Sequence, residues 1–435
     1  MREEFLYYLW ENRLIDKVLQ TTEGETVEVV ATGYRNTDSG PDFLEAKIHI
    51  GDKLWAGQVE IHVKASDWNR HGHENDKAYR NVILHVVYEN DTQATDLPTL
   101  ELKGHFDEAL FANYQKFISA KGWIPCEKSI AQVPPFTRLS WLDRMAVERL
   151  ESKSESVNKI LNANQFDWED ALYKLLMRYL GLKVNNEAFE TLSNILPFKV
   201  LLKHADNLLQ VEAMLFGCAG FLEGEFGEAY PQLLQREFAV MRAKFNLIAM
   251  PAERFKFMRM RPSNFPTVRL AQMAQLIHKN GPLFSKIREA KTVGEVKALC
   301  DVEASAYWET HYRFGVGLSY HGSRTSSLWL PQCDSPTKPK PKHLGDATAD
   351  ILIINAVVPL LFCYGKLHKD ESYCDAAMQF LEATEAEDNA VIRHFSQCGI
   401  VAQNAMQTQA LLHLFNIYCK RKRCLECRIG HVLLR

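Results

Sequence analysis

The sequence predicts an α+β protein, in which a small mixed N-terminal sheet is followed by a larger, mostly helical region. Apolar and polar residues alternate between residues 26 and 63, which is typical of half-buried strands. Residues 81–89 form a more continuous apolar run, as expected for a strand covered on both faces. From residue 138 onward, apolar residues recur mainly at helical spacing.

The elements of the N-terminal part are expected in the order helix, three-stranded meander, short helix or loop, and buried strand. Apolar residues at helical spacing between residues 5 and 14 predict the first helix. A tight turn at Gly51-Asp52 joins the second and third strands of the meander. Strands are expected over residues 26–34, 43–50, 54–63, 81–89 and 97–104.

The 435 residues exceed one ordinary core, so we expect several domains. The pattern changes at Pro134-Pro135, and a Pro- and Lys-rich stretch interrupts the helical region later. The expected segments are an α/β domain, a helical domain with an arginine-rich motif, an exposed loop, and C-terminal helices with a basic, Cys-bearing tail. Their bounds are residues 1–133, 134–329, 330–348 and 349–435.

Composition indicates a soluble globular protein, with 46% hydrophobic and 24% charged residues. A net charge of -3 argues against a uniformly basic nucleic-acid coat, although it allows a local basic groove. The N-terminus lacks the apolar core of a signal peptide, and the apolar run at residues 351–364 contains Asn355 and Pro359. That run is short enough to be a buried core helix. We therefore expect a cytoplasmic protein with reduced cysteines and no membrane partner.

Two acids on neighbouring strands form the main candidate site. Side chains two apart on a strand share a face, so Gln58, Glu60, His62 and Lys64 point one way. Asp42 begins the preceding, antiparallel strand, which brings it near Glu60. Two carboxylates with a nearby nitrogen base suit Mg²⁺ or Mn²⁺, which would activate a water and screen phosphate charge. The alternative is a polar strand with a solvent-facing Glu and Lys.

This arrangement resembles the PD-(D/E)xK, or restriction-endonuclease-like, phosphodiesterase fold over about residues 1–110. The resemblance implies an α-βββ-α-β core, with Asp42 as the metal-binding acid and Glu60 as the second acid. His62 then stands where the motif has lysine. A second alignment puts Gln58 at the acid and Glu60 at the lysine position, and Glu11 matches an extra acid on the first helix. Lys64 shares the face but lies further along the strand, so the resemblance leaves an active, altered or inactive site open.

Nearly the whole chain also resembles an uncharacterised bacterial family of unknown function. The phrases that carry this resemblance are "GPDF", "WAGQVEIH", "SDWNRHGH", "NVILHVV" and "MRPSNFPTVRLAQMAQL". The resemblance implies membership but no activity.

A His-rich connection follows the acidic strand. His71 and His73 form a His-x-His pair in a polar loop, which suits a transition-metal pair or a proton-shuttling pair. The alternative is a polar loop with hydrogen-bonded histidines. His49 and His85 lie on strands, where we expect structural roles. One face of the meander is therefore predicted to be a divalent-metal platform that this loop overhangs.

An arginine-rich motif with interleaved phenylalanines lies in the helical region, and arginines with aromatics suit phosphate forks and base stacking. The alternative is a turn whose arginines pair with acids of neighbouring helices. The candidate nucleic-acid-binding residues are Arg254, Arg259, Arg261 and Arg269.

The C-terminal cysteines have the spacing C-x₄-C-x₂-C at Cys419, Cys424 and Cys427. The last pair suits a zinc knuckle, with Cys398 or His431 as the fourth ligand. The alternative is a group of half-buried thiols at a helix end, and an iron–sulfur cluster is a less favoured reading than zinc.

Two functions compete on these residues. The first is a Mg²⁺- or Mn²⁺-dependent phosphodiesterase that acts on nucleic acid, with Asp42 and Glu60 as ligands. The second is a catalytically inactive, nuclease-derived module that binds nucleic acid or protein, which the missing motif lysine favours.

Overall fold

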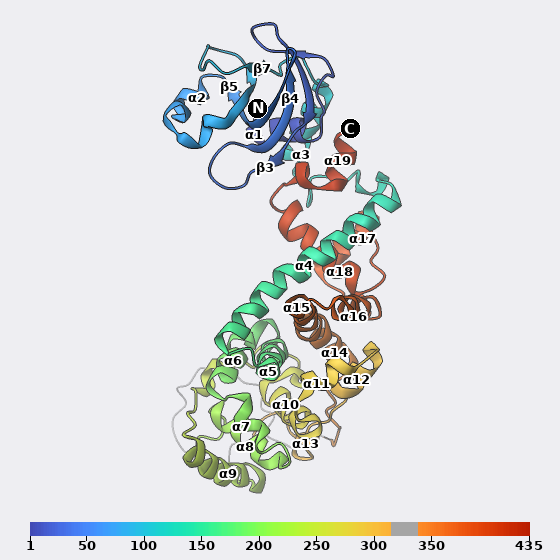
Figure 1. Cartoon of the computed structure of the whole chain (residues 1–435). Coiled ribbons are helices and arrows are strands. Elements are labelled where there is room, and N and C mark those ends of the chain that lie inside the picture. Colours follow the sequence, from blue (N-terminus) through green and yellow to red (C-terminus); the bar gives the residue numbers. More distant parts are fainter. Residues whose placement is uncertain (315–337) are drawn as a thin grey trace, which may run out of the picture. The chain divides into compact units, whose positions relative to one another are not determined.

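The structure is a computed structural model that describes residues 1–314 and 338–435 (Figure 1). The chain divides into two compact units. The sheet unit comprises residues 1–141, 397–400 and 414–435, and the helical unit comprises residues 142–396 and 401–413. This division differs from the expected one, because the Cys-bearing tail belongs with the N-terminal sheet rather than with the helices before it.

The sheet unit contains one mixed sheet in the strand order β1-β2-β4-β5-β6-β7, with β3 paired to β4. Strands β2, β4 and β5 are antiparallel neighbours, whereas β5, β6 and β7 run parallel. The predicted order of helix, meander, short helix or loop and buried strand is confirmed, as is the α+β class. The strands are β1 (Leu19–Gln20), β2 (Thr26–Ala31), β3 (Tyr34–Arg35), β4 (Phe43–Ile50), β5 (Lys53–Lys64), β6 (Val82–Glu89) and β7 (Thr99–Glu101).

Helix α1 lies against the sheet, and both ends of the chain belong to this unit (Figure 1). Helix α4 contains the boundary between the two units. The elements are α1 (Glu3–Glu11), α2 (Asp67–Arg70), η1 (His73–Asn75), η2 (Lys77–Asn81), α3 (Glu108–Ser119), η3 (Ile130–Gln132), α4 (Pro135–Ala163), η7 (Leu414–Cys419), η8 (Cys424–Glu426) and α19 (Arg428–Leu434).

Helix α1 is shorter than its apolar pattern predicts. Arg13 adopts a positive φ of 50°, and the N–H of Leu14 donates to the carbonyl of Leu9 (2.8 Å). A left-handed residue with such a bond is a common helix C-terminus. Leu14 still packs against the core, so its apolar character is used outside the helix.

The two faces of β5 separate as predicted. Val59 and Ile61 are fully buried in the hydrophobic core that α1 covers. Glu60 and His62 lie on the opposite face, because alternate residues of a strand point to opposite sides. Leu434 from α19 also belongs to this core, which explains why the tail returns to the sheet.

The helical unit consists of short helices and turns around an apolar interior. Its elements are α5 (Trp168–Leu180), α6 (Leu182–Ile195), α7 (Phe198–Leu202), α8 (Leu208–Cys218), α9 (Ala229–Phe245), η4 (Ala252–Arg254), η5 (Pro262–Asn264), α10 (Pro266–Asn280), α11 (Leu283–Glu289), α12 (Val293–Cys300), α13 (Tyr307–Thr310), α14 (Asp346–Leu352), η6 (Ile353–Val357), α15 (Val358–His368), α16 (Glu371–Glu382), α17 (Ala390–Gln397) and α18 (Ala405–His413).

The apolar run expected to be a core helix lies within α14, η6 and α15. By length and composition, Asp346–His368 could cross a membrane, with a mean hydropathy of 1.9. The most apolar 18-residue stretch of this segment is 72% buried inside the protein. Such burial is characteristic of a core helix.

The expected loop over residues 330–348 lies partly outside the described residues. Its described part is not simply exposed, because Lys342 is buried and its ammonium donates to the carbonyls of Trp308 and Glu309. Gln272 of α10 donates to the carbonyls of Lys342 and His343 (3.0 and 2.9 Å). This segment is therefore held by hydrogen bonds from side chains to backbone carbonyls.

Arg269 of α10 holds the same segment from inside. The guanidinium is only 5% exposed and donates to the Leu344 carbonyl (3.4 Å) and to the Thr348 hydroxyl (3.0 Å). Asn264 Oδ1 (2.6 Å) and Gln272 Oε1 (2.8 Å) accept its remaining bonds. Burial lowers the pKa of Arg269 to about 10. Its hydrogen bonds thus join the start of α10 to the start of α14.

We predict that Arg269→Ala destabilises the protein by ~2–4 kcal/mol, because several buried acceptors lose their donor. Arg254→Ala, at an exposed position of the same motif, should change stability by less than ~0.5 kcal/mol. Urea unfolding followed by far-UV circular dichroism measures both effects. Equal shifts of the two midpoints would contradict the internal role of Arg269.

Candidate functional site

Asp42 and Glu60 lie side by side at the start of β4. The antiparallel register pairs Phe43 with Val59, which sets the residue before Phe43 beside the residue after Val59. The backbone N–H of Asp42 donates to Glu60 Oε2 (3.1 Å), and the N–H of Ile61 donates to Asp42 Oδ2 (2.9 Å). Each carboxylate is therefore held by the backbone of the neighbouring strand.

Two β-bulges lie next to this pair. The register of β4 against β5 shifts between Phe43 and Ala46, and that of β6 against β5 shifts at Gln58. Glu45, in the first bulge, has a positive φ of 58°. Bulges are common beside active sites, where they re-aim side chains. Gln58 Oε1 is buried here without a partner among the described residues, so it is an acceptor that a ligand could engage.

Four imidazoles surround the Glu60 carboxylate. His62 lies two residues further along β5, and His85 lies on β6 opposite Glu60. His71 ends α2, and His73 begins η1. Glu60 Oε1 is 3.4 Å from His62 Nε2 and 3.3 Å from His73 Nε2. Ring nitrogens of His62, His71 and His73 lie within 4.8 Å of one another.

His85 orients His62 rather than facing the loop. His62 Nδ1 and His85 Nε2 are hydrogen-bonded at 2.9 Å, and both residues are almost fully buried. If His62 Nδ1 carries the proton, its Nε2 presents a lone pair toward Glu60 Oε1. Metal-binding histidines commonly donate their second ring N–H in this way. His85 is therefore a positioning residue for His62.

Aromatic side chains enclose the histidines. The Tyr79 ring stacks on His73 with 3.9 Å between centroids. Trp68 packs edge-on against His62 and His73. Asp67 fixes the turn that carries these rings, because it accepts from the N–H of Lys64 (3.3 Å) and pairs with Arg70 (2.8 Å). The loop predicted to overhang the sheet is thus packed onto it.

Burial shifts both carboxylates toward the neutral form. It raises the pKa of Glu60 to about 9, with a further contribution from the charge of Asp42. Burial also raises the pKa of Asp42, while hydrogen bonds from Ile61 and Tyr7 and the charge of Arg35 oppose this shift. Two buried acids that resist ionisation together gain stability from a divalent cation.

The pKa values of three of the imidazoles are lowered, whereas those of the carboxylates are raised. Burial lowers the pKa of His62 to about 3 and that of His85 to about 4, each helped by a neighbouring histidine. Burial and the charge of His71 lower the pKa of His73. The close contact between His62 and Glu60 is consequently not an ion pair at neutral pH. Uncharged imidazole is the form that binds metals.

Helix α1 contributes two residues that the sequence analysis did not identify. The Tyr7 hydroxyl donates to Asp42, and the charge of Asp42 adds to the burial that raises the pKa of Glu3. Glu11, the expected helix acid, is exposed at the far end of α1. Glu3 and Tyr7 are four residues apart, so they share a helix face; this spacing was the available signal.

Arg35 and Arg70 act electrostatically on residues of the site, whereas Lys64 does not. Lys64 is exposed, and its charge acts on Asp91 rather than on the acid pair. Arg35 lowers the pKa of Asp42, and Arg70 contributes to the lowered pKa of His62. These two exposed guanidiniums are therefore the cations electrostatically coupled to the site.

The donor set fits a divalent metal ion. His62 Nε2 and His73 Nε2 are buried without a hydrogen-bond partner in the described part of the chain, and both approach Glu60 Oε1. A site of carboxylate oxygens and imidazole nitrogens suits Mn²⁺ and other transition metals. Mg²⁺ prefers a site made of oxygen ligands alone.

The expected nucleic-acid-binding arginines are split between surface and interior. Arg254, Arg259 and Arg261 are exposed, whereas Arg269 is buried by the bonds described above. Phe255 and Phe265 are also buried rather than available for base stacking. A contact with phosphate therefore remains a hypothesis only for the three exposed arginines.

The C-terminal cysteines acquire a neighbour that spacing did not reveal. Cys419, Cys424 and Cys427 line one cavity with Cys126, from the turn after α3. Cys398, the expected fourth ligand, is not among the lining residues, and His431 hydrogen-bonds with the Tyr8 hydroxyl (3.0 Å).

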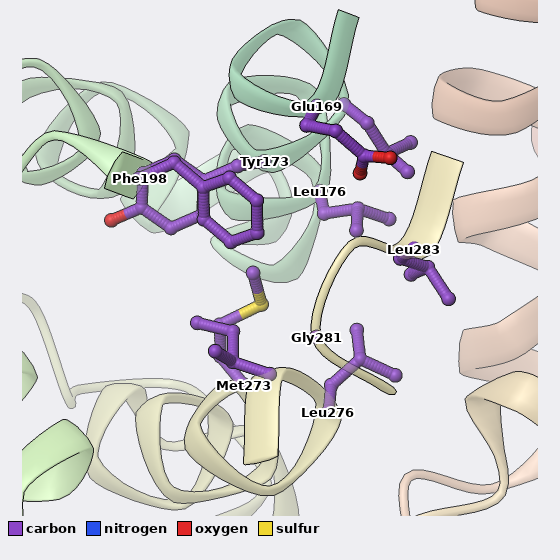
Figure 2. Close-up of a pocket in the computed structure, with 10 residues that line it drawn as sticks. Glu169, Tyr173, Leu176, Phe198, Met273, Leu276, Gly281 and Leu283 are labelled. Carbon is purple, nitrogen blue, oxygen red and sulfur yellow. The ribbon is translucent and has the colours of Figure 1, made fainter. Parts of the chain in front are cut away.

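The helical unit contains a small apolar cavity between α5, α10 and α11 (Figure 2). Its volume of about 10 Å³ is no larger than one water needs. Glu169 at its edge accepts from the N–H groups of Phe284 (2.8 Å) and Ser285 (2.9 Å), which is a helix-capping role. This cavity is a packing gap rather than a substrate site.

A wider cleft of about 1110 Å³ lies elsewhere in this unit, around Arg149 and Glu387. Some of its charged groups are engaged internally: Lys297 pairs with Asp350 (2.7 Å), and Arg149 donates to Gln409 (2.5 Å). The mixture of paired charges indicates no particular ligand class.

Fold and site together define an α+β protein with a buried carboxylate–histidine centre on its N-terminal sheet. Residues 3–390 match the family described as protein of unknown function, DUF2851, and the chain belongs to this family. The expected membership of an uncharacterised full-length family is thereby confirmed. Neither the curated proteins nor the solved structures contain a significant match to the chain.

The raised pKa of Glu60 predicts a pH-dependent stability of the metal-free protein. The folded value of about 9 exceeds the unfolded value of ~4.3, so this stabilisation is complete at low pH and is lost as pH rises toward 9. The stability of Glu60→Gln relative to wild type should therefore increase by at least ~1 kcal/mol as the pH rises from ~6.5 to ~8.5. Chelator-treated proteins compared by thermal unfolding provide the measurement.

Glu28→Gln, at an exposed position of β2, is the control and should follow wild type at every pH. The lowered pKa of His62 acts in another window, since its stabilisation is lost only as pH falls from ~6.5 toward 3. Parallel pH profiles for Glu60→Gln and wild type would show that the carboxyl is not protonated in the folded state.

Proposed function

We propose that the sheet unit is a divalent-metal-dependent phosphodiesterase that acts on nucleic acid. The observation that carries the proposal is the acid pair: Asp42 and Glu60 are each held by the other strand's backbone, next to unpartnered imidazole nitrogens. Hydrolysis of a phosphodiester needs positioning and charge neutralisation more than a covalent intermediate.

The order of elements supports this proposal. Helix α1 precedes the antiparallel strands β2, β4 and β5, and α2 leads to β6, which runs parallel to β5. The PD-(D/E)xK fold has the same order. Asp42 follows Pro41, and Glu60 lies on the next strand with His62 two residues later, so the acids match the motif and the lysine position is changed.

Asp42 and Glu60 would hold the metal, with His62 and His73 as nitrogen ligands beside them. The mixed oxygen and nitrogen donors favour Mn²⁺ over Mg²⁺. Such a metal supplies an acidified water and neutralises phosphate charge.

The remaining residues have separable tasks. Tyr7 and the N–H of Ile61 hold Asp42, and His85 holds His62. His71 is the exposed imidazole of the cluster, so solvent and substrate can reach it. Arg35 and Arg70 are exposed cations that act on the site and would contact the phosphates.

His62 also favours the second function, a nuclease-derived module that binds without cutting. A lysine at this position would carry a fixed positive charge, whereas the lowered pKa of His62 keeps the imidazole neutral. The acid pair would then serve binding alone. A cytoplasmic location suits either function, since every cysteine in residues 1–314 and 338–435 is a free thiol.

We predict that wild-type protein cleaves labelled DNA or RNA with Mn²⁺, and more slowly with Mg²⁺. Asp42→Asn and Glu60→Gln should lower the rate at least ~100-fold, because a lost ligand removes several kcal/mol of charge stabilisation. Binding of the same oligonucleotides, measured by fluorescence anisotropy with Ca²⁺ in place of Mn²⁺, should change little.

Glu28→Gln is the matched control and should cut at the wild-type rate. Salt-sensitive binding without cutting by wild type, on single- and double-stranded polymers and with both metals, would establish the inactive module instead. If neither binding nor cutting occurs, the phosphodiesterase and the nucleic-acid-binding module both fail, and only the protein-binding form of the module remains. Replacing Arg254, Arg259 and Arg261 together by alanine should weaken binding and flatten its salt dependence only if these residues contact phosphate.

A further inference from the structure

The cysteine cluster of the sheet unit is a second potential site that the proposed function does not use. Cys126, Cys419, Cys424 and Cys427 line one cavity of about 20 Å³, which has room for about one water-sized sphere. The other lining residues bring no carboxylate and no imidazole. The cavity is therefore a small, sulfur-lined space.

The four cysteines form one group of reduced sulfurs. None is in a disulfide, and Cys419, Cys424 and Cys427 are each less than a tenth exposed. Beyond burial, the charges of neighbouring cysteines, including Cys398, raise the pKa values of Cys126 and Cys419. The four cysteines of the group are those that line the same small cavity.

The backbone around Cys427 is shaped to receive a thiolate. Burial raises the pKa of the Cys427 thiol, whereas the N–H groups of Gly430 and Ile429 and the indole of Trp141 lower it. Gly430 packs so closely against the Cys424 carbonyl that a Cβ would overlap with it. Close packing of this kind limits how far the cysteine side chains can move around a bound metal.

We propose that Cys126, Cys419, Cys424 and Cys427 bind one zinc ion as a closed structural site. The four thiols bind as thiolates, four protons pass to solvent, and no electron is transferred. Arg423 lines the cavity with its charge paired to Glu426, and Lys422 is the cation whose charge lowers the pKa of Cys424. Because the cavity holds about one small sphere, it suits a single ion rather than an iron–sulfur cluster.

The zinc site would hold the C-terminal segment on the sheet. Cys126 follows α3, and Lys422 donates to the Ile118 carbonyl at the end of that helix. Beyond Cys427, Leu434 enters the sheet core, and His431 hydrogen-bonds with Tyr8 of α1. One ion thus connects three segments that are distant in sequence.

Zinc content of the full chain after dialysis against a chelator tests the proposal. Wild type should retain one equivalent by mass spectrometry of the metal. Cys126→Ser and Cys424→Ser should each lose it, whereas Cys398→Ser should keep it. The double variant His71→Ala/His73→Ala should also keep it, which separates this zinc from metal bound at the carboxylate–histidine centre.

Gly430→Ala changes no ligand but displaces the Cys424 carbonyl, so zinc release to the chelator should be about 10-fold faster. If the cysteine variants do not fold, a measurement on the wild-type protein still tests the zinc proposal. Reduced, metal-free wild type titrated with Co²⁺ should develop thiolate-to-metal absorption that saturates at one equivalent. Absence of these bands, or zinc retained by Cys126→Ser, would overturn the proposal.

Discussion

The candidate centre depends on two backbone N–H groups that cross the pairing of β4 with β5. One fixes Glu60 and the other fixes Asp42, so the acids cannot separate unless the strands separate. The register that brings them together is set by the apolar partners Phe43 and Val59, both fully buried. Core packing thereby supplies the stability that offsets the burial of two carboxylates.

The sheet unit keeps hard and soft donors apart. Oxygen and nitrogen atoms gather on one face of β5, whereas sulfur atoms gather between the turn after α3 and the C-terminal segment. Such segregation would let the two proposed metal sites select different metals by ligand type within one small unit. Helix α1 touches both regions, since Tyr7 contacts Asp42 and Tyr8 contacts His431.

Local sequence patterns predicted those features of the structure that are set by residues close together in the chain. Alternation along residues 54–63 correctly put Glu60 and His62 on the face opposite Val59 and Ile61, because the period of a strand is two. The partnership of Cys126 with the C-terminal cysteines depends on chain return, which leaves no mark in local spacing. Arg269 resembled its exposed neighbours until its buried acceptors on α14 were seen.

The burial of Leu434 in the sheet core affects how the protein is made. Domains usually fold as they emerge from the ribosome, with N-terminal ones completed first. Here the sheet that begins at residue 19 lacks part of its interior until residue 434 has been synthesised. The first domain to be translated is therefore the last to be finished, and its apolar interior stays incomplete throughout elongation.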